Sequence, residues 1–430
     1  MSSASYRTLL RGPGAAAFFF AAAVGRVGIA MTSLGIVWLV HARTGSYGAA
    51  GLVTGGFAVA EAVAGPQLAR LTDRFGQTRV LPPVLLAHAG AVGTLLALVA
   101  AGAPGWLMAA GGVLVGATIP QLGALSAARW ATLLRDERAV ALPAAFALEA
   151  LGNEAAYLAG PVLVSILGIS GYPAAGPVLA ATLVVAGGLC FAAQRRTAPP
   201  PASGATERHR AGRTLLRPGF AVVAGVNLAI GGFFGAMPIS VTAFAVEHGA
   251  AGMAALLFTV SSCASLLAGW LYGLRRWRTP QRVQLALVAA GLAFGCLPLL
   301  VAGSPLELGL NVALTGLAIP LILVSCTVLA ESAVHRAVLT QAFAWLGSAS
   351  AVGSAGAAAV AGWAVDAGGA HGGFAVAAVA AAVMAVLAVT GLRVSRVPAE
   401  RVLRARPVVA HHRRREPSCA GGDIAQHAPE

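Results

Sequence analysis

Ionisable side chains are rare in the apolar parts of this chain, and their types suggest proton chemistry. The run ALEALGNEAAYLAGP holds Glu149, Asn153 and Glu154, while Arg26 and Glu61 lie in two earlier apolar runs. Residues four apart on a helix share a face, so Glu149 and Asn153 point the same way and Glu154 points elsewhere. A carboxyl group in apolar surroundings can take up and release a proton as its surroundings change. These residues are therefore candidates for a proton-linked step.

The depths of these residues allow two of them to meet. Arg26 lies about 18 Å along its apolar run if that run is helical, and Glu149 and Glu154 lie about 15 and 22 Å from one end of theirs. An ion pair between Arg26 and one of the two glutamates can therefore form. The spacing leaves open which glutamate is the partner. It also leaves open whether the pair is static or takes part in proton transfer.

Single amides occur in other apolar runs, at Asn227, Asn311, Gln121 and Gln341. Amides in membranes often hydrogen bond between helices, so a structural role is the alternative for each of them. Seven residues inside the apolar runs are the candidates for such a step, and we call them the predicted pathway: Arg26, Glu61, Glu149, Asn153, Glu154, Asn227 and Asn311.

A short charged stretch, LTDRFGQTR, separates two of the apolar runs at residues 71–79, and its distinctive residues are Asp73, Arg74, Gly76 and Arg79. A connection this short makes the flanking helices antiparallel neighbours, and Gly76 permits a positive φ or a close backbone approach. Asp73 can accept hydrogen bonds from the N terminus of a neighbouring helix or from arginines. A connection that only set the topology would need arginine alone, so Asp73 indicates a further role for this stretch.

The elements that position these residues are membrane-spanning helices. The chain is 58% apolar and 10% charged, with a mean hydropathy of +0.79, whereas about a quarter of the residues in a soluble domain are charged. Only helices and closed barrels satisfy the backbone in lipid, and no alternating barrel pattern is visible. We predict an all-α protein with twelve spans, at residues 14–40, 48–69, 80–101, 105–128, 139–167, 173–194, 218–245, 250–273, 283–302, 306–330, 339–364 and 372–392.

The basic residues predict the orientation of these spans. The net charge is +14, and all 29 basic residues are arginines. All of them except Arg26, within a span, and Arg43 lie in alternate connections or at the chain ends, which leaves 27 of 29 on one side. Arginine-rich connections face the cytoplasm. We therefore expect a multi-pass protein of the cytoplasmic membrane with both termini in the cytoplasm. This distribution explains the charge without a nucleic-acid partner.

The chain divides into two halves of six spans. We expect an N-terminal segment at 1–13, bundles at 14–194 and 218–392, a flexible linker at 195–217 and a disordered cytoplasmic tail at 393–430. GATIP at 116–120 and GLAIP at 316–320 lie at an offset of 200, and AFA recurs at 145–147 and 342–344. Gly65 and Gly269 also precede equivalent basic connections. The common offset predicts two structurally similar halves.

Two six-helix halves, a basic central linker and a charged connection between the second and third spans resemble the major facilitator superfamily of secondary transporters. Its loop signature, G-x-L-(A/S)-D-R-x-G-R-(R/K), is matched by Leu71, Asp73, Arg74 and Gly76. Arg79 supplies a basic residue one place late, whereas Ala69, Thr72, Gln77 and Thr78 depart from the signature. The resemblance covers about residues 14–392. It implies that Asp73 helps to latch the two halves in one state.

Gly160-Pro161 resembles part of G-x-x-x-G-P-x-x-G-G, a signature of family exporters that exchange substrate for protons; Ala156, Val164 and Ser165 depart from it. We therefore expect a monomeric, proton-coupled exporter of a small organic molecule. The alternatives are an importer of a sugar-like or organic-acid solute and, less favoured, a membrane enzyme or a receptor. No P-loop or Cys/His metal spacing occurs, so we expect no cofactor and no metal.

Overall fold

Long helices make up nearly all of the described part of the chain. The computed structural model describes residues 6–169, 171–201, 210–249, 253–275, 277 and 279–394, and it assigns no strand to them. Residues Met1–Val394 form one unit. The predicted tail, apart from its first two residues, and residues 202–209 of the predicted linker lie outside the described residues.

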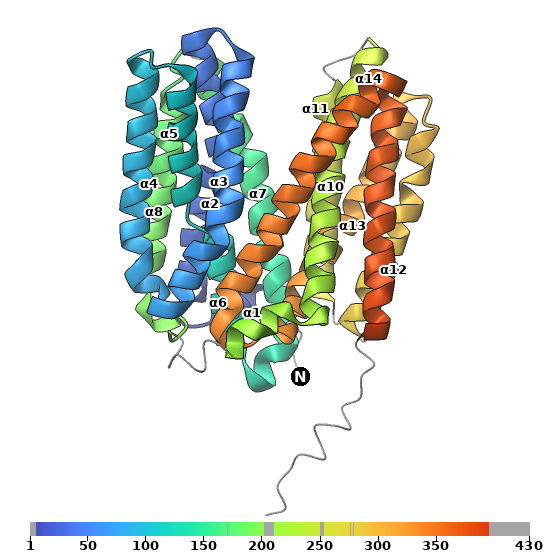
Figure 1. Cartoon of the computed structure of the whole chain (residues 1–430). Coiled ribbons are helices and arrows are strands. Elements are labelled where there is room, and N and C mark those ends of the chain that lie inside the picture. Colours follow the sequence, from blue (N-terminus) through green and yellow to red (C-terminus); the bar gives the residue numbers. More distant parts are fainter. Residues whose placement is uncertain are drawn as a thin grey trace, which may run out of the picture. The chain divides into compact units, whose positions relative to one another are not determined.

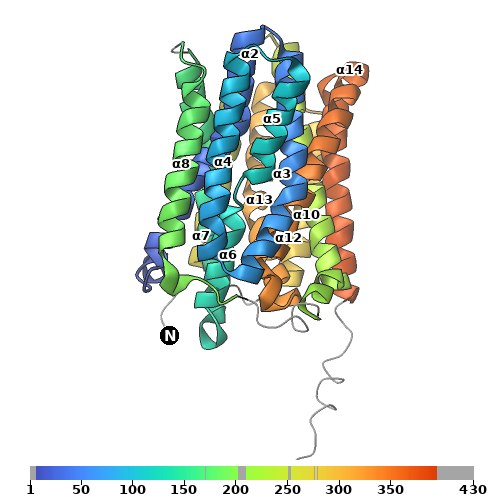
Figure 2. The same ribbon diagram turned by 60° about the vertical axis from the view of Figure 1, so that its left-hand side comes forward.

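The first bundle contains six spans. It begins with a short helix, α1 (Tyr6–Leu10), followed by α2 (Ala15–Thr44), α3 (Tyr47–Phe75), α4 (Gln77–Ala100), α5 (Gly105–Thr118), α6 (Leu122–Leu133), α7 (Leu142–Ile169) and α8 (Ala175–Ala193). α5 and α6 together form one interrupted span. α2 packs against α7 and α8, and α4 packs against α5 and α8 (Figure 2).

The second bundle contains the other six spans. Its helices are α10 (Pro218–Glu247), α11 (Met253–Leu274), α12 (Gln281–Gly295), α13 (Pro305–Ala333) and α14 (Leu339–Val394). α14 is two spans joined by a kink at Gly368 and Gly369, where φ of Gly369 is +69°. The chain reverses direction there (Figure 1). With this kink counted, the eleven long apolar helices of the described residues give the twelve predicted spans.

Apolar side chains on the outer faces of the bundles are exposed. Examples are Leu86, Phe294, Leu310, Trp363 and Val386. Exposed apolar surface on this scale would cause association in water, and a hydrocarbon environment suits it. The fold is therefore that of a multi-pass membrane protein, as predicted.

The charged stretch at 71–79 is more helical than a connecting loop. α3 continues through Asp73 to Phe75, and α4 begins at Gln77. Gly76 alone makes the turn, with φ +89° and ψ 142°. Of the two roles that the sequence allows for Gly76, the structure shows the positive φ, and the expected loop is reduced to this single residue.

The two bundles use their repeated motifs in similar ways. Gly116 of GATIP packs against the backbone of Phe57 in α3, and Gly316 of GLAIP packs against Ser261 in α11. The repeated AFA segments meet each other, because the rings of Phe146 and Phe343 lie 6.0 Å apart in an edge arrangement. The packing of Gly116 and Gly316 on the second span of their own half agrees with the similarity that the common offset predicts.

Glycines bring α10 and α14 into close contact. A side chain at Gly231 would overlap the carbonyl oxygen of Ser350, and one at Gly235 would overlap that of Ser354. Small residues allow helix backbones to approach in this way in lipid, where no hydrophobic force drives helices together. The contact holds the first span of the second bundle against α14, which lines the cavity described below.

Gly235→Ala is therefore expected to destabilise the protein by roughly 1–3 kcal/mol, because the added methyl group forces the two backbones apart. Gly291→Ala is the matched control, since a methyl group there meets no atom within 4 Å. Thermal midpoints of the two purified variants test this expectation. Equal midpoints would contradict the packing role of Gly235.

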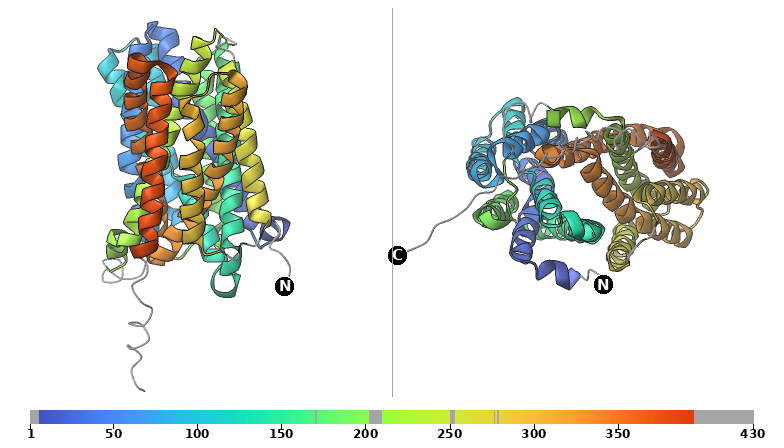
Figure 3. Two further views of the ribbon diagram at one scale, coloured as in Figure 1. Left: turned by 90° about the vertical axis from the view of Figure 1, so that its right-hand side faces the viewer. Right: turned by 90° about the horizontal axis from the view of Figure 1, so that it is seen from below.

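The bundles are joined at one end of the molecule. We call this the arginine-rich end; it carries Arg74, Arg79, Arg135, Arg213 and Arg336, and the described N-terminal helix lies there (Figure 1). Seen from this end, the two bundles lie side by side (Figure 3). Tyr6 and Asp73 make hydrogen bonds from the first bundle to the second at this end.

Candidate functional site

A cavity of about 640 Å³ lies between the two bundles. Its walls come from α2, α3, α6 and α7 on one side and from α10, α13 and α14 on the other. Five residues of the predicted pathway line it, namely Arg26, Glu61, Asn153, Glu154 and Asn227. A smaller space of about 190 Å³ shares Arg26, Asn153 and Asn227 with it and adds Glu149. Residues predicted separately from four apolar runs are thus brought together around one cavity.

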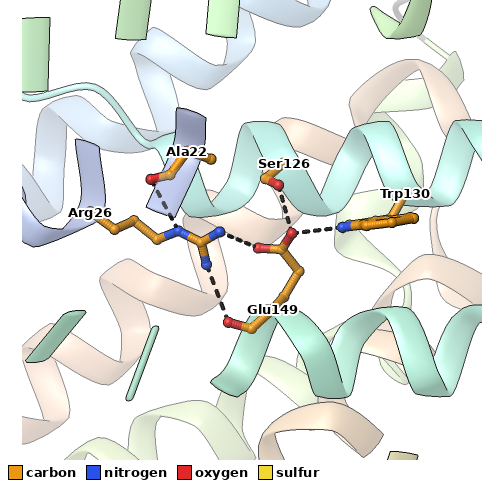
Figure 4. Close-up of polar contacts among 5 residues, drawn as sticks. All are labelled: Ala22, Arg26, Ser126, Trp130 and Glu149. Carbon is orange, nitrogen blue, oxygen red and sulfur yellow. Dashed lines mark hydrogen bonds and ion pairs between the residues drawn. The ribbon is translucent and has the colours of Figure 1, made fainter. Parts of the chain in front are cut away.

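Arg26 and Glu149 form a buried ion pair, as Figure 4 shows. Arg26 Nη2 lies 2.7 Å from Glu149 Oε2, and Nη1 donates to the Glu149 carbonyl oxygen at 3.2 Å. Ser126 Oγ and Trp130 Nε1 donate to Glu149 Oε1 at 2.6 and 2.7 Å. The arginine side chain is 5% exposed and the glutamate side chain 10%. Glu149 is therefore the partner that the sequence left undecided.

The network joins three helices at the side of the cavity. Arg26 comes from α2, Ser126 and Trp130 from α6, and Glu149 from α7. Each Glu149 oxygen has a charged or polar partner, so the carboxylate charge is balanced. An arrangement of this kind is typical of a fixed structural ion pair.

Glu61 and Glu154 also line the cavity, and neither forms an ion pair among the described residues. The Glu61 carboxyl group lies beside Gln121, and that of Glu154 lies beside Ser265. Tyr157, on α7, is close enough to both carboxyl groups to interact electrostatically with them. Among the described residues these two carboxyl groups thus face the cavity without an ion-pair partner, whereas Glu149 is paired with Arg26.

The interrupted span is a feature of the cavity that the sequence analysis did not predict. α5 ends at Thr118 and α6 begins at Leu122, and Pro120, Gln121 and Gly123 line the cavity. Broken helices occur in membranes where the freed backbone groups face a cavity. Pro320 occupies the equivalent place in GLAIP, yet α13 is continuous. The residues that follow the two prolines differ: Leu323 stands where the first bundle has Gly123, and glycine is the poorer helix former.

Asn311 lies outside the cavity. Its side-chain amide donates to the Glu307 carbonyl oxygen of its own helix at 2.8 Å. Asn227 lines the cavity and also bonds within its helix, to Val223 at 2.9 Å. The structure thus brings Asn227 to the site and leaves Asn311 near one end of α13.

Asp73 joins the two bundles at the arginine-rich end. Its Oδ2 accepts a hydrogen bond from the backbone N–H of Gln341 at 2.9 Å. Gln341 is the third residue of α14, so this N–H is one of the four at the start of a helix that have no partner within the helix. Of the two kinds of partner that the sequence allows for Asp73, a helix N terminus or arginines, the structure shows the helix N terminus. This contact connects α3 of one bundle with α14 of the other.

The other residues of the charged stretch have different surroundings. Arg74 and Arg79 are exposed, and the Arg74 guanidinium lies over the Phe75 ring. Gln77, where the family signature has a basic residue, is buried and accepts a hydrogen bond from Arg129 Nε at 2.9 Å. Arg129 is also buried and donates to carbonyl oxygens at the end of α8. The sequence analysis counts Arg129 as a loop arginine, and nothing in its local sequence distinguishes it from one.

Tyr6 forms the second connection at this end. Its hydroxyl group lies 3.0 Å from the Gly269 carbonyl oxygen and 3.1 Å from that of Trp270, both on α11. Burial raises the pKa of Tyr6 to about 12, so the hydroxyl group keeps its proton at neutral pH and can donate. The short helix α1 thereby attaches the N-terminal segment to the second bundle.

Gly160 and Pro161 lie within α7, where it packs on α2. A methyl group at Gly160 would lie 2.9 Å from Ala30 Cβ and 3.1 Å from the Met31 backbone nitrogen. Gly160 therefore permits a close approach of α7 to the helix that carries Arg26. Among the described residues, no group of three or more potential metal ligands occurs.

Asp73→Asn is expected to slow turnover more than it weakens substrate binding. The asparagine keeps an acceptor for the Gln341 N–H but loses the charge, whose interaction with a helix N terminus contributes about 0.3–1 kcal/mol. This change destabilises the state closed at the arginine-rich end and leaves the cavity intact. Flux and binding measured on the same preparation test it, with exposed Asp366→Asn as the control. A defect in binding alone would contradict the latch.

The comparison with known families agrees with this geometry. The profile of the Major Facilitator Superfamily matches residues 18–310 of the chain, which is more than half of it. No curated protein sequence matches the chain.

Several solved structures share the fold. The human organic anion transporter MFSD10 (TETRAN) has a TM-score of 0.67 at 15% identity, over 89% of this chain and 99% of that one. The major facilitator transporter FucP in its outward conformation has a TM-score of 0.63 at 16% identity, and the match covers 87% of this chain and 97% of that one. A bacterial homologue of the iron transporter ferroportin, in an outward-facing state, has a TM-score of 0.66 at 13% identity, and the match covers 88% of this chain and 99% of that one. Family profile, fold and cavity together place the chain in the major facilitator superfamily, as a multi-pass membrane transporter of small molecules and not an enzyme.

Proposed function

We propose that this protein is a proton-coupled secondary transporter that exports a small organic molecule across the cytoplasmic membrane by alternating access. The observation that carries the proposal is the cavity between the bundles, which contains two carboxyl groups without ion-pair partners among the described residues. Transporters of this kind bind substrate near the midplane, between two repeats that move against each other. We expect the protein to act as a monomer, because one chain supplies both repeats.

The distribution of arginine supports an orientation for the cycle. The arginine-rich end faces the cytoplasm under the positive-inside rule, and both chain ends then lie there. With that orientation, the contacts of Asp73 and Tyr6 close the cytoplasmic side. The paired rings of Phe146 and Phe343 also border the smaller space beside the central cavity. The described conformation then corresponds to an outward-facing state.

Proton coupling is supported by Glu61 and Glu154. A carboxyl group that meets the cavity in one state and a different environment in the other can bind a proton on one side and release it on the other. Glu149 is a weaker candidate, because its charge is balanced by Arg26 at 2.7 Å. The coupling is therefore assigned to the two free carboxyl groups and the static role to the ion pair.

Export is supported by Gly160-Pro161 in α7, the part of the exporter signature that the chain retains. An importer of a sugar-like solute is the second candidate. The amides of Gln121, Asn153 and Asn227 that line the cavity favour it, because they could bond to hydroxyl groups. An organic acid fits less well, since the charge of the one arginine lining the cavity is balanced by Glu149.

Flux in proteoliposomes distinguishes these functions. Compounds that raise the thermal midpoint of the purified protein are first identified, because a ligand that binds only the folded state stabilises it. Each is then offered outside liposomes with an acidic lumen. Exchange for protons predicts accumulation in the lumen that a protonophore abolishes. If the pH gradient instead drives the compound out of loaded liposomes, the protein imports the compound together with protons. A flux of the compound that does not change with the pH gradient would contradict proton coupling.

A further inference from the structure

A side pocket of about 170 Å³ opens beside the central cavity. It lies among α10, α11 and α13, and it shares Glu154 and Phe234 with the cavity. Most of its wall is apolar, with Phe233, Met237 and Phe258 among the lining residues. Glu154 therefore lies where the side pocket of the second bundle meets the central cavity.

The pocket contains a buried polar group, the hydroxyl group of Ser265. The Ser265 side chain is 3% exposed, and its hydroxyl group has no hydrogen bond of normal geometry among the described residues. It lies beside the Glu154 carboxyl group and lines the same pocket. A buried hydroxyl group without a partner costs about 1–3 kcal/mol. A bound molecule that reaches Ser265 and Glu154 would remove this cost.

The charges around the pocket favour a cation. Glu154 has no ion pair among the described residues, and no basic residue lines the side pocket. The central cavity contains one arginine, Arg26, whose charge is balanced by Glu149. Glu61 adds a second free carboxyl group across the cavity. When both are ionised, the combined space is negative, although the whole chain carries +14.

The size and lining of the pocket fit an apolar ring. A dry cavity of about 150 Å³ is known to hold benzene, so a pocket of similar volume can hold one six-membered ring. Aromatic rings in the wall also attract a cation held near their faces. The pocket is too small for a whole drug-sized molecule, for which about 300–1,000 Å³ is usual. The remainder of such a molecule would occupy the central cavity.

We propose that the substrate is an amphipathic organic cation, with an apolar ring in the side pocket and its positive charge paired with Glu154. The inference names the substrate class of the proposed exporter and rests on that function. A proton and the cation would then compete for Glu154, because a protonated carboxyl group cannot form the ion pair.

Binding of radiolabelled tetraphenylphosphonium to the purified protein in detergent tests the inference. This cation carries four phenyl rings, of which one fits the side pocket. Glu154→Gln should raise its Kd by roughly tenfold or more, since an ion pair shielded from water loses one partner. Ser262→Phe, which fills the pocket without changing charge, should also weaken binding. Asp366→Asn removes an exposed carboxylate of the same bundle and should leave the Kd unchanged.

Charge and folding are tested separately. Tetraphenylborate has nearly the same shape and the opposite charge, so it should not displace the label. Glu154→Asp keeps the charge and should retain binding. It replaces Glu154→Gln as the test variant where Glu154→Gln folds poorly. Displacement by tetraphenylborate, or wild-type affinity in Glu154→Gln, would overturn the inference. Absence of binding to the wild type would also overturn it, whereas gradient-driven flux of another compound would still support the proposed exporter.

Discussion

Arg26→Met is expected to lower the stability of the folded protein by about 3–5 kcal/mol, which is the usual cost of leaving one partner of a buried ion pair unpaired. Glu149 would keep the hydrogen bonds from Ser126 and Trp130 but lose the positive charge that lies 2.7 Å from it. The thermal midpoint and the monodisperse fraction after extraction should both fall. Transport should fall with the amount of folded protein.

The double variant Arg26→Met/Glu149→Gln is the matched control. It removes both charges, and the introduced glutamine keeps a carbonyl oxygen that can accept from Ser126 and Trp130. Replacing a buried pair by neutral groups of similar volume is often nearly neutral. The double variant should therefore recover most of the stability that Arg26→Met loses. A double variant as unstable as Arg26→Met would contradict the assignment of this pair to structure.

Glu61→Gln is expected to abolish gradient-driven flux while preserving exchange of substrate in the absence of a gradient. Glutamine imitates the neutral carboxyl group but cannot release a proton, so the carrier can still reorient without coupling. Because Glu61 faces the cavity and has no ion pair among the described residues, its neutralisation leaves no unpaired charge behind. Flux driven by a pH gradient and exchange at equal pH, measured in the same liposomes, separate the two effects.

Glu149→Gln provides the comparison for that experiment. If Glu149 only balances Arg26, the variant should lose stability rather than coupling, and the protein that remains folded should respond to the gradient. Loss of coupling in Glu149→Gln with full coupling in Glu61→Gln would reverse the roles given to the two residues. The sequence analysis includes both glutamates in one pathway, and the ion pair gives them different roles.

Much of the fold could be predicted because a lipid environment imposes strong rules on sequence. The length of each apolar run and the alternation of arginine predicted twelve spans and their order. The residue types of the charged stretch allowed a positive φ at Gly76 and a contact of Asp73 with a helix N terminus, and the structure has both. Helix rise alone brought Arg26 and Glu149 to compatible depths.

Other features depend on packing between distant segments and could not be predicted. Arg26 pairs with Glu149 and not with Glu154 because of the way α7 is rotated about its axis against α2. The depth of a residue along its helix does not specify this rotation. The burial of Arg129 depends on Gln77 and the end of α8. The break before α6 occurs in GATIP and not in GLAIP, although both contain proline. The side pocket at Glu154 arises only when three helices of the second bundle assemble.

Access to the cavity from both sides of the membrane tests the central claim most directly. Ala351 is exposed and lines the cavity, and the five native cysteines can first be replaced. Ala351→Cys should react with a membrane-impermeant thiol reagent added to either face, because alternating access opens the cavity to each side in turn. Ala101→Cys, at the end of α4 away from the arginine-rich end, should react from one face only. Reaction of Ala351→Cys from a single face, under conditions that support transport, would contradict a two-state carrier.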